Sequence, residues 1–221
     1  MAMTNYEIKK ITINSELYPK ILKEIGDPPH ILYYVGKFPS TSLFPLAIVG
    51  SRQSDKYGED VLTYLLTPEI LDNTLIISGL ARGIDTKAHL LARHTIAILG
   101  TGLDRASFYP PENWSLCQNI VANGGLIISE YAPGTKANFS HFPQRNRIIA
   151  GLSKAVLVVQ AKKRSGALIT ARLALESGRD VWAVPGPIFN ELSAGVNKLI
   201  SQGATPITSS DDLKQCLTEN S

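Results

Sequence analysis

The sequence has little cysteine and no long apolar run. Its 221 residues include two cysteines, Cys117 and Cys216, which argues against a disulfide framework and a four-cysteine zinc site. The N-terminus lacks the apolar segment of a secretory signal, and no apolar stretch approaches the length that spans a bilayer. The four histidines show no metal-ligand spacing. These absences predict a cytoplasmic protein that needs no metal, cofactor or membrane.

Familiar nucleotide-binding and catalytic motifs are also missing. The fragment "GTGLDR" has Arg105 where a dinucleotide fingerprint needs its third glycine, which disfavours a nicotinamide dehydrogenase. Neither a phosphate-binding G-x-x-x-x-G-K-[ST] loop nor a G-x-S-x-G elbow is present. Asp85 and His89 share a helix face and form a conceivable acid/base pair, although such residues more often serve structure. Cys117 is predicted to be buried. We therefore expect a protein that is not an enzyme.

Acidic residues are nearly absent from one long stretch. The whole chain carries 22 Lys and Arg against 19 Asp and Glu, and a net charge of +3 does not by itself imply a polyanionic partner. From position 131 to position 177, however, Glu176 is the single acid, while the cations are Lys136, Arg145, Arg147, Lys154, Lys162, Lys163, Arg164 and Arg172. These cations exceed what one mononucleotide needs and suit a polymer of phosphates.

Short apolar runs alternate with helical patterns along most of the chain. We expect strands at 46–50, 75–79, 95–100, 126–130, 155–160, 181–186 and 205–209, with helices near 56–66, 84–93, 112–122, 143–152, 166–177, 193–202 and 210–218. Continuous hydrophobicity marks strands covered on both faces, as in parallel sheets. The sequence predicts an α/β fold, a doubly wound, mostly parallel sheet of the extended Rossmann-like kind over residues 45–221. Residues 1–44 are expected to form a short N-terminal appendage with a helix and a strand.

Glycine, serine and arginine gather in the loops that leave the carboxyl ends of these strands. Ligands of parallel sheets bind at that edge, where helix N-termini offer free amides. The first loop brings amides, a hydroxyl and a cation to one place, or else is an ordinary turn with an exposed arginine. Later loops at the same edge include the cluster of Lys162, Lys163 and Arg164. The candidate residues in these loops are Gly50, Ser51, Arg52, Gln53, Arg82, Ser165 and Gly166.

The segment "FPQRNRIIAGLS" places two arginines at the head of an apolar helix. At about 100° per residue, Arg145 shares the apolar face, whereas Arg147 points about 200° away. A buried Arg145 needs a partner, which is either an acid, with Glu130 as a candidate, or a ligand phosphate. Asn146 flanks it at the same edge. Arg147 is either solvated or in contact with phosphate.

A cation and an aromatic residue share the loop before that helix. Lys136 and Phe139 offer charge and a stacking surface, which together suit single-stranded nucleic acid. The alternative is that Phe139 or Phe142 fills the core. Downstream, Ser165 is predicted to cap a helix whose Leu168, Leu173 and Leu175 point inward.

The series "AIVGSR", "ISGLARGID", "AILGTGLD", "GGLIISEY", "FPQRNRIIAGLS", "SGALITARLALE" and "VWAVPGPIFN" closely resembles the DprA/Smf (DNA processing protein A) family over about residues 17–213. The resemblance implies an extended Rossmann-like domain that binds single-stranded DNA and loads the RecA recombinase during natural transformation, commonly as a dimer. It also implies that Gly50, Ser51, Arg52, Lys136, Phe139, Arg145, Asn146, Arg147, Ser165 and Gly166 lie in or beside the DNA site.

Two other expectations follow from the sequence. Many relatives carry a helical N-terminal domain and a C-terminal winged-helix-like domain, so the chain is either a minimal member or a part of a longer protein. The helix "VNKLISQGA" and the strand after it are the expected self-contact of a homodimer. The alternative function is that of a nucleotide-binding or nucleotide-cleaving Rossmann enzyme of the lysine-decarboxylase-like class, although the "PGGxGTxxE" block of such enzymes is absent.

Overall fold

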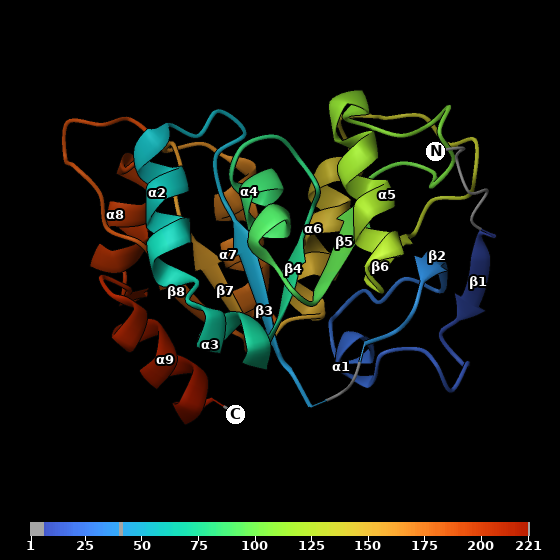
Figure 1. Ribbon diagram of the computed structural model, residues 1–221, viewed down its shortest axis with the longest axis horizontal. Helices are drawn as coiled ribbons and strands as arrows, with labels where there is room; N and C mark the ends of the chain where they lie inside the picture. The colour runs from blue at the N-terminus through green and yellow to red at the C-terminus, as the bar shows by residue number, and fades with distance from the viewer. Residues whose placement is uncertain (1–6, 40–41, 221) are drawn as a thin grey trace.

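The computed structural model describes residues 7–39 and 42–220, and these form three layers with a twisted sheet in the middle (Figure 1). Within the described residues the sheet has nine strands in the order β1-β2-β6-β5-β4-β3-β7-β8-β9. The strands are β1 (Lys9–Thr12), β2 (Ile31–Gly36), β3 (Phe44–Val49), β4 (Thr74–Ser78), β5 (Thr95–Leu99), β6 (Leu126–Ser129), β7 (Ala155–Val158), β8 (Asp180–Ala183) and β9 (Thr205–Pro206). From β6 to β9 every neighbouring pair is parallel, which confirms the predicted fold class.

Helices cover both faces of the sheet. One face carries α1 (Lys20–Lys23), α6 (His141–Gly151), α7 (Gly166–Glu176) and α8 (Ala194–Ser201). The other carries α2 (Lys56–Leu65), α3 (Pro68–Asn73), α4 (Ile84–Leu91), α5 (Trp114–Ala122) with the short 3₁₀ helix η1 (Pro111–Asn113), and α9 (Ser210–Glu219). No helix in the described ranges combines the length and the apolar character needed to cross a membrane.

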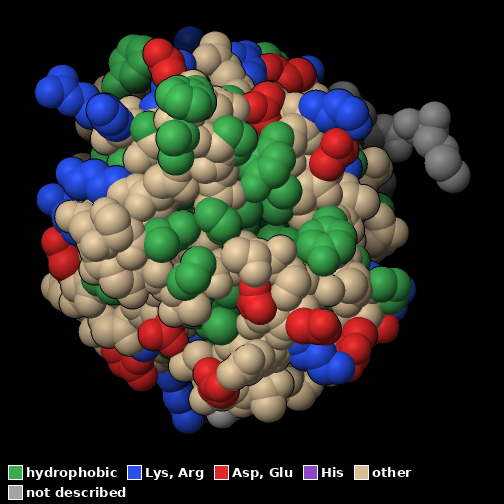
Figure 2. Space-filling model, turned by 90° about the vertical axis from the view of Figure 1, so that its left-hand side faces the viewer, with side chains coloured by type: hydrophobic (Ala, Val, Ile, Leu, Met, Phe, Trp, Pro, Cys, Tyr) green, Lys and Arg blue, Asp and Glu red, His purple; other side chains and the backbone are tan. Residues whose placement is uncertain are grey.

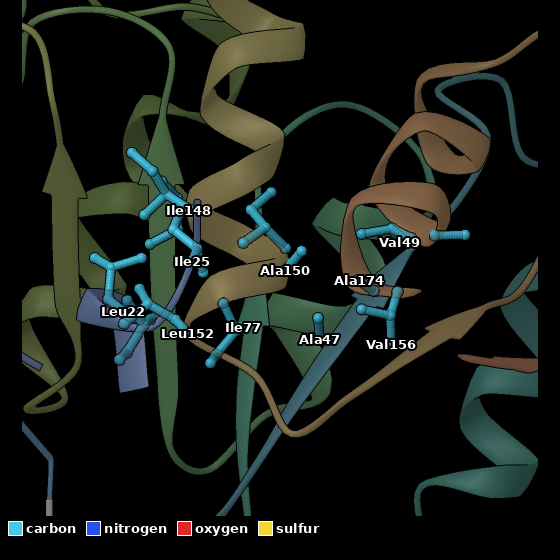
Figure 3. Close-up of a cluster of buried hydrophobic side chains, with 14 of the residues drawn as sticks. Leu22, Ile25, Ala47, Val49, Ile77, Ile148, Ala150, Leu152, Val156 and Ala174 are labelled. Atoms are coloured by element: carbon cyan, nitrogen blue, oxygen red, sulfur yellow. The ribbon is translucent and has the colours of Figure 1, made fainter. Parts of the chain in front are cut away.

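Strand β3 shows why its apolar run is continuous. Leu46 and Ile48 pack beneath α2 and α4, whereas Ala47 and Val49 face α6 and α7, because successive side chains alternate between faces. Figure 3 shows the hydrophobic cluster on the α6 and α7 face of the sheet, where Ala47, Val49, Ile77 and Val156 meet side chains of these two helices. A strand buried on both faces has no polar positions, as predicted.

The order in which successive strands are placed in the sheet reverses at β3. Strands β4, β5 and β6 are added on one side of β3, and β7, β8 and β9 on the other. Because the two halves wind away from each other, the loops after β3 and β7 diverge and leave a crevice at the carboxyl edge. The sequence therefore positions a binding site between residues 50–55 and 159–166.

The described residues of the predicted N-terminal segment contribute to the same sheet. Strand β2 pairs antiparallel with β6, and β1 pairs antiparallel with β2. Leu22 and Ile25 pack against α6 in the central cluster (Figure 3). The rest of the predicted segment, residues 1–6 and 40–41, lies outside the described residues, as does position 221 of the main domain.

Helix α7 departs from its predicted orientation. Leu175 is 60% exposed rather than inward, and the buried face consists of Ala167, Thr170, Ala171 and Ala174. Leu168 and Leu173 are only partly buried at the margin of the cluster. Small residues let α7 approach α6 closely. The inward prediction is therefore wrong for Leu175, whereas Leu168 and Leu173 do pack against the core cluster, at its margin.

Candidate functional site

A groove of about 610 Å³ lies at the carboxyl edge of the sheet, at the reversal point. It is bounded by the loops after β3, β4 and β7 and by the first turns of α6 and α7. Ten of the twelve candidate residues line it, namely Gly50, Ser51, Arg52, Gln53, Arg82, Phe139, Arg145, Asn146, Ser165 and Gly166. Lys136 and Arg147 are not among the lining residues. Residues from five separate segments are thus brought to one place.

The loop after β3 is fixed by its own backbone and by α4. The Ser51 carbonyl accepts from the Ile84 amide at 3.1 Å, and Ser51 Oγ accepts from the Gln53 amide at 3.1 Å. Gly50 is required here because a Cβ at this position would meet the Ile84 side chain at 2.6 Å. The loop is therefore a preformed wall of the groove.

The helix that follows this loop does not offer its N-terminus to a ligand. Asp55 caps α2 and accepts from the Gly58 amide at 3.1 Å, and its carboxylate also accepts from Gln160 and Asn190. Burial raises the pKa of Asp55, but these hydrogen bonds outweigh it and lower the pKa below its ordinary value. A carboxylate already occupies this helix end.

The N-terminus of α7 is open by comparison. Its cap residue, Ser165, has extended backbone but makes no side-chain cap hydrogen bond, and its buried Oγ has no partner among the described residues. Asn146 Nδ2 donates to the Gly166 carbonyl at 3.2 Å and so ties α6 to the start of α7. The positive end of the α7 dipole and its free amides face the groove.

Arg145 is the buried cation of the site. It is 3% exposed, and its Nε and Nη1 have no hydrogen-bond partner in the described part of the chain. Burial lowers the pKa of Arg145 to about 10, although the neighbouring Asp85 carboxylate opposes this, so the guanidinium is charged at neutral pH. A Cβ added at Gly79 would collide with this guanidinium, which explains the glycine. The side chain is thus clamped at the groove with unused donors.

Asp85 and His89 lie behind Arg145 rather than in open solvent. Asp85 Oδ2 accepts from the amides of Gly79 at 3.1 Å and Ala81 at 3.4 Å. His89 Nδ1 is 2.8 Å from Thr95 Oγ1. Burial, reinforced by Arg145, lowers the pKa of His89 to about 3. Asp85 therefore organises the loop after β4, and His89 joins α4 to the start of β5.

Glu130 was the candidate partner of Arg145, and this expectation is wrong. Arg147 Nη2 donates to Glu130 Oε1, and Arg147 Nε donates to Asp27 Oδ2 at 2.9 Å. Burial lowers the pKa of Arg147, but these two carboxylates outweigh it and raise the pKa. The predicted divergence of the two arginines holds, but Arg147 is neither solvated nor in the groove: its side chain is 16% exposed and joins α6 to the N-terminal segment.

Two phenylalanines of the preceding loop have different environments. Phe139 lines the groove and is 92% exposed, so it does not fill the core. Phe142 is half-buried, and the Arg52 guanidinium lies 5.0 Å from its ring centroid. Lys136 is exposed on the same loop. An apolar surface thus stands at the groove mouth beside a cation held over an aromatic ring.

The charge of the groove is strongly positive. Arg52, Arg82, Arg145, Lys162 and Arg164 line it against a single carboxylate, Asp85. Arg82 is paired with Glu112 at the rim. The sequence placed Lys162, Lys163 and Arg164 at this edge of the sheet; Lys162 and Arg164 line the groove, whereas Lys163 is not among the lining residues. No cluster of three or more His, Cys, Asp or Glu residues suited to a metal occurs in the described ranges.

Fold and groove together define a class, the Rossmann-like α/β proteins whose ligand groove lies at the switch point of the sheet. The chain belongs to the DNA recombination-mediator protein A family, whose model matches residues 9–218, and the resemblance seen in the motifs is confirmed. It is 46% identical over 207 residues to DNA processing protein DprA of Streptococcus pneumoniae (strain ATCC BAA-255 / R6), covering 91% of this chain and 72% of that protein.

Solved structures agree with this assignment. The X-ray structure of DprA from Streptococcus pneumoniae matches with a TM-score of 0.87 and 42% identity, covering 95% of this chain and 74% of that one. A structure of DNA processing protein A from Helicobacter pylori, described for its single-stranded DNA binding mode, matches with a TM-score of 0.84 and 29% identity over 97% of both chains.

Proposed function

We propose that the protein binds single-stranded DNA in the groove and does so without catalysing a reaction. The observation that carries the proposal is Arg145, a buried, charged guanidinium whose Nε and Nη1 lack an acceptor among the described residues. Burying a charged guanidinium with unpaired N–H donors costs free energy unless a ligand accepts hydrogen bonds from them. A phosphate is the natural acceptor for a guanidinium. The Helicobacter pylori relative, described as binding single-stranded DNA, supports the same ligand here.

In this proposal the phosphates lie on Ser51, Arg52, Arg145 and the open end of α7. Gly50 and Gly166 let the DNA backbone approach, Asn146 holds the two helices in register, and Gln53 and Arg82 border the strand. Phe139 stacks on a base, which only a single strand presents freely. Lys136 meets the strand outside the groove, and Arg147 acts indirectly by fixing α6.

Binding rather than chemistry is supported by the one acid/base pair near the groove. His89 has a pKa of about 3 and is buried, so it neither donates nor accepts a proton usefully near neutral pH. Its neighbour Asp85 is committed to two backbone amides. Asp85 thus holds the loop that borders the groove, and His89 joins α4 to β5.

The family assignment supports a role in DNA processing. We propose that the protein protects incoming single-stranded DNA and loads the RecA recombinase on it during natural transformation or recombination, in the cytoplasm. A homodimer through α8 and β9 accompanies this role. Strand β9 is the end strand of the described sheet, and hydrophobic side chains gather on the side of the molecule where α2, α8 and α9 lie, at the left of Figure 1 (Figure 2). Light scattering that finds only monomer at high protein concentration would remove the dimer from the proposal.

A competition gel-shift series tests the DNA proposal. Labelled single-stranded DNA should be displaced by unlabelled single strands far better than by duplex or by nucleoside monophosphates, and less complex should form at the higher of two salt concentrations. Displacement by mononucleotides, with release of free base, would instead favour a nucleotide-cleaving Rossmann enzyme. An affinity that is the same at both salt concentrations would count against a phosphate-binding site.

A further inference from the structure

A second apolar surface adjoins the groove. The loop of residues 185–193 carries Ile188 and Phe189, which are 80% and 97% exposed. Phe189 borders a shallow hollow whose other walls include Gln53 and Lys162. Gln53 and Lys162 also line the main groove, so the two depressions are continuous.

The loop that carries Phe189 is firmly held. The Tyr57 hydroxyl donates to the Pro185 carbonyl at 2.6 Å, and Asn197 exchanges two hydrogen bonds with the backbone of Gly186, at 3.1 and 2.9 Å. Asn190 Nδ2 donates to Asp55 Oδ2 at 2.9 Å, and Asn190 Oδ1 accepts from the Leu192 amide at 2.9 Å. Polar anchors fix the loop while its apolar tip contributes nothing to the core. A rigid, exposed apolar tip beside a groove is suited to binding a ligand at low entropic cost.

We propose that Phe189, with Ile188 beside it, is a second stacking platform for the DNA strand, reached by nucleotides that leave the groove past Gln53 and Lys162. This inference rests on the proposed DNA-binding function. Phe139 lines the main groove, Phe189 lines the adjoining hollow, and the cation Lys162 lines both. Stacking surfaces and charges together are what a single-stranded polynucleotide binds. Duplex DNA would not use Phe189, because its bases are already stacked.

Lys162, beside the hollow that Phe189 borders, is paired with a carboxylate that a phosphate could replace. Its Nζ is 3.4 Å from Glu191 Oε2, and both side chains are at least half exposed. Exposed pairs of this kind are weak, so a phosphate passing the hollow can take Lys162 from Glu191. Glu191→Gln, which releases Lys162 and removes a negative charge, should therefore strengthen binding of long strands about 2- to 5-fold.

Strand length provides the test. Oligothymidines of about 4 nucleotides should occupy the main groove alone, whereas strands of about 12 should also reach Phe189. Phe189→Ala should weaken binding of the long strand about 5- to 20-fold and leave the short strand unchanged, whereas Phe139→Ala should weaken both. Tyr64→Ala is the matched control, because Tyr64 is 60% exposed on α2 and lines neither depression. In Phe189→Trp, the long strand should quench tryptophan fluorescence more than in the unmodified protein.

The possible failures are distinguishable. If Phe139→Ala and Arg52→Ala leave all strands bound as before, the proposed function itself fails. If those variants weaken binding but Phe189→Ala affects long and short strands alike or not at all, only the second platform is overturned. Light scattering that shows Phe189→Ala turning dimer into monomer, with long-strand affinity unchanged, would assign the surface to a second copy of the chain.

Discussion

The proposed DNA binding should depend on salt, and the number of cations in the groove sets how steeply. Five Lys and Arg side chains line it. Each phosphate of a single strand that is neutralised contributes about 0.7 to the slope of log K against log salt, so the limiting slope is about −3.5. Raising salt from about 50 to about 200 mM should then weaken binding about 130-fold.

Arg52→Ala removes one of these cations at little cost to the fold, because Arg52 is exposed and its contact is with the face of Phe142. The slope should fall to about −2.8, and the same salt step should weaken binding only about 50-fold. The loss of affinity should be equal for all base sequences, because phosphate contacts carry no sequence information. Fluorescence anisotropy with labelled oligothymidine and a mixed sequence measures both quantities.

Lys214→Ala is the control for this experiment, because Lys214 lies on α9 and pairs with Glu69. Its slope should match that of the unmodified protein. The reasoning is refuted if the unmodified protein has a slope near zero, or if Arg52→Ala and Lys214→Ala change the slope equally.

Three other variants separate the roles of neighbouring residues. Gly79→Ala should weaken single-strand binding about tenfold with the circular dichroism spectrum unchanged, because the new Cβ displaces the Arg145 guanidinium; unchanged affinity would contradict the clamp. Arg147→Ala should lower the free energy of unfolding in urea by about 1 to 2 kcal/mol and leave the salt slope alone; a reduced slope would instead assign Arg147 to the DNA. The folded-state pKa of His89 is about 3, below its ordinary 6.5, so below about pH 6.5 the unfolded chain binds a proton that the folded protein does not. The free energy of unfolding should therefore fall as the pH drops from about 6.5, by up to about 1.4 kcal/mol per pH unit. In His89→Gln this fall should be smaller.

The order and type of most elements could be predicted because the core strands are covered on both faces. The runs of β3, β4 and β5 are uninterrupted, and they were placed within a residue or two of their bounds. Helix α3 was missed, although Thr67 and Pro68 form a cap and first position of the usual kind, because the helix is only six residues long. Strand β1 was missed because its pattern has one buried residue, Ile11.

The groove was predictable where helical phase or strand ends decide the geometry. Arg145 and Arg147 were assigned to opposite faces from the 3.6-residue period alone. The partner of each arginine depends on contacts between distant segments. Asp27 lies 120 residues from Arg147, and Asp85 reaches Arg145 from the first turn of α4. No periodicity within one helix contains that information.

The dimensions of the groove are set by packing far from any charge. The buried face of α7 consists of Ala167, Thr170, Ala171 and Ala174, and α6 and α7 pack closely because these side chains are small. That approach lets Asn146 reach the Gly166 carbonyl and brings the open α7 N-terminus beside Arg145. A leucine in place of any of the three alanines would push the helices apart and widen the groove, so these alanines, which the leucine pattern did not indicate, also set the space available to the proposed phosphate.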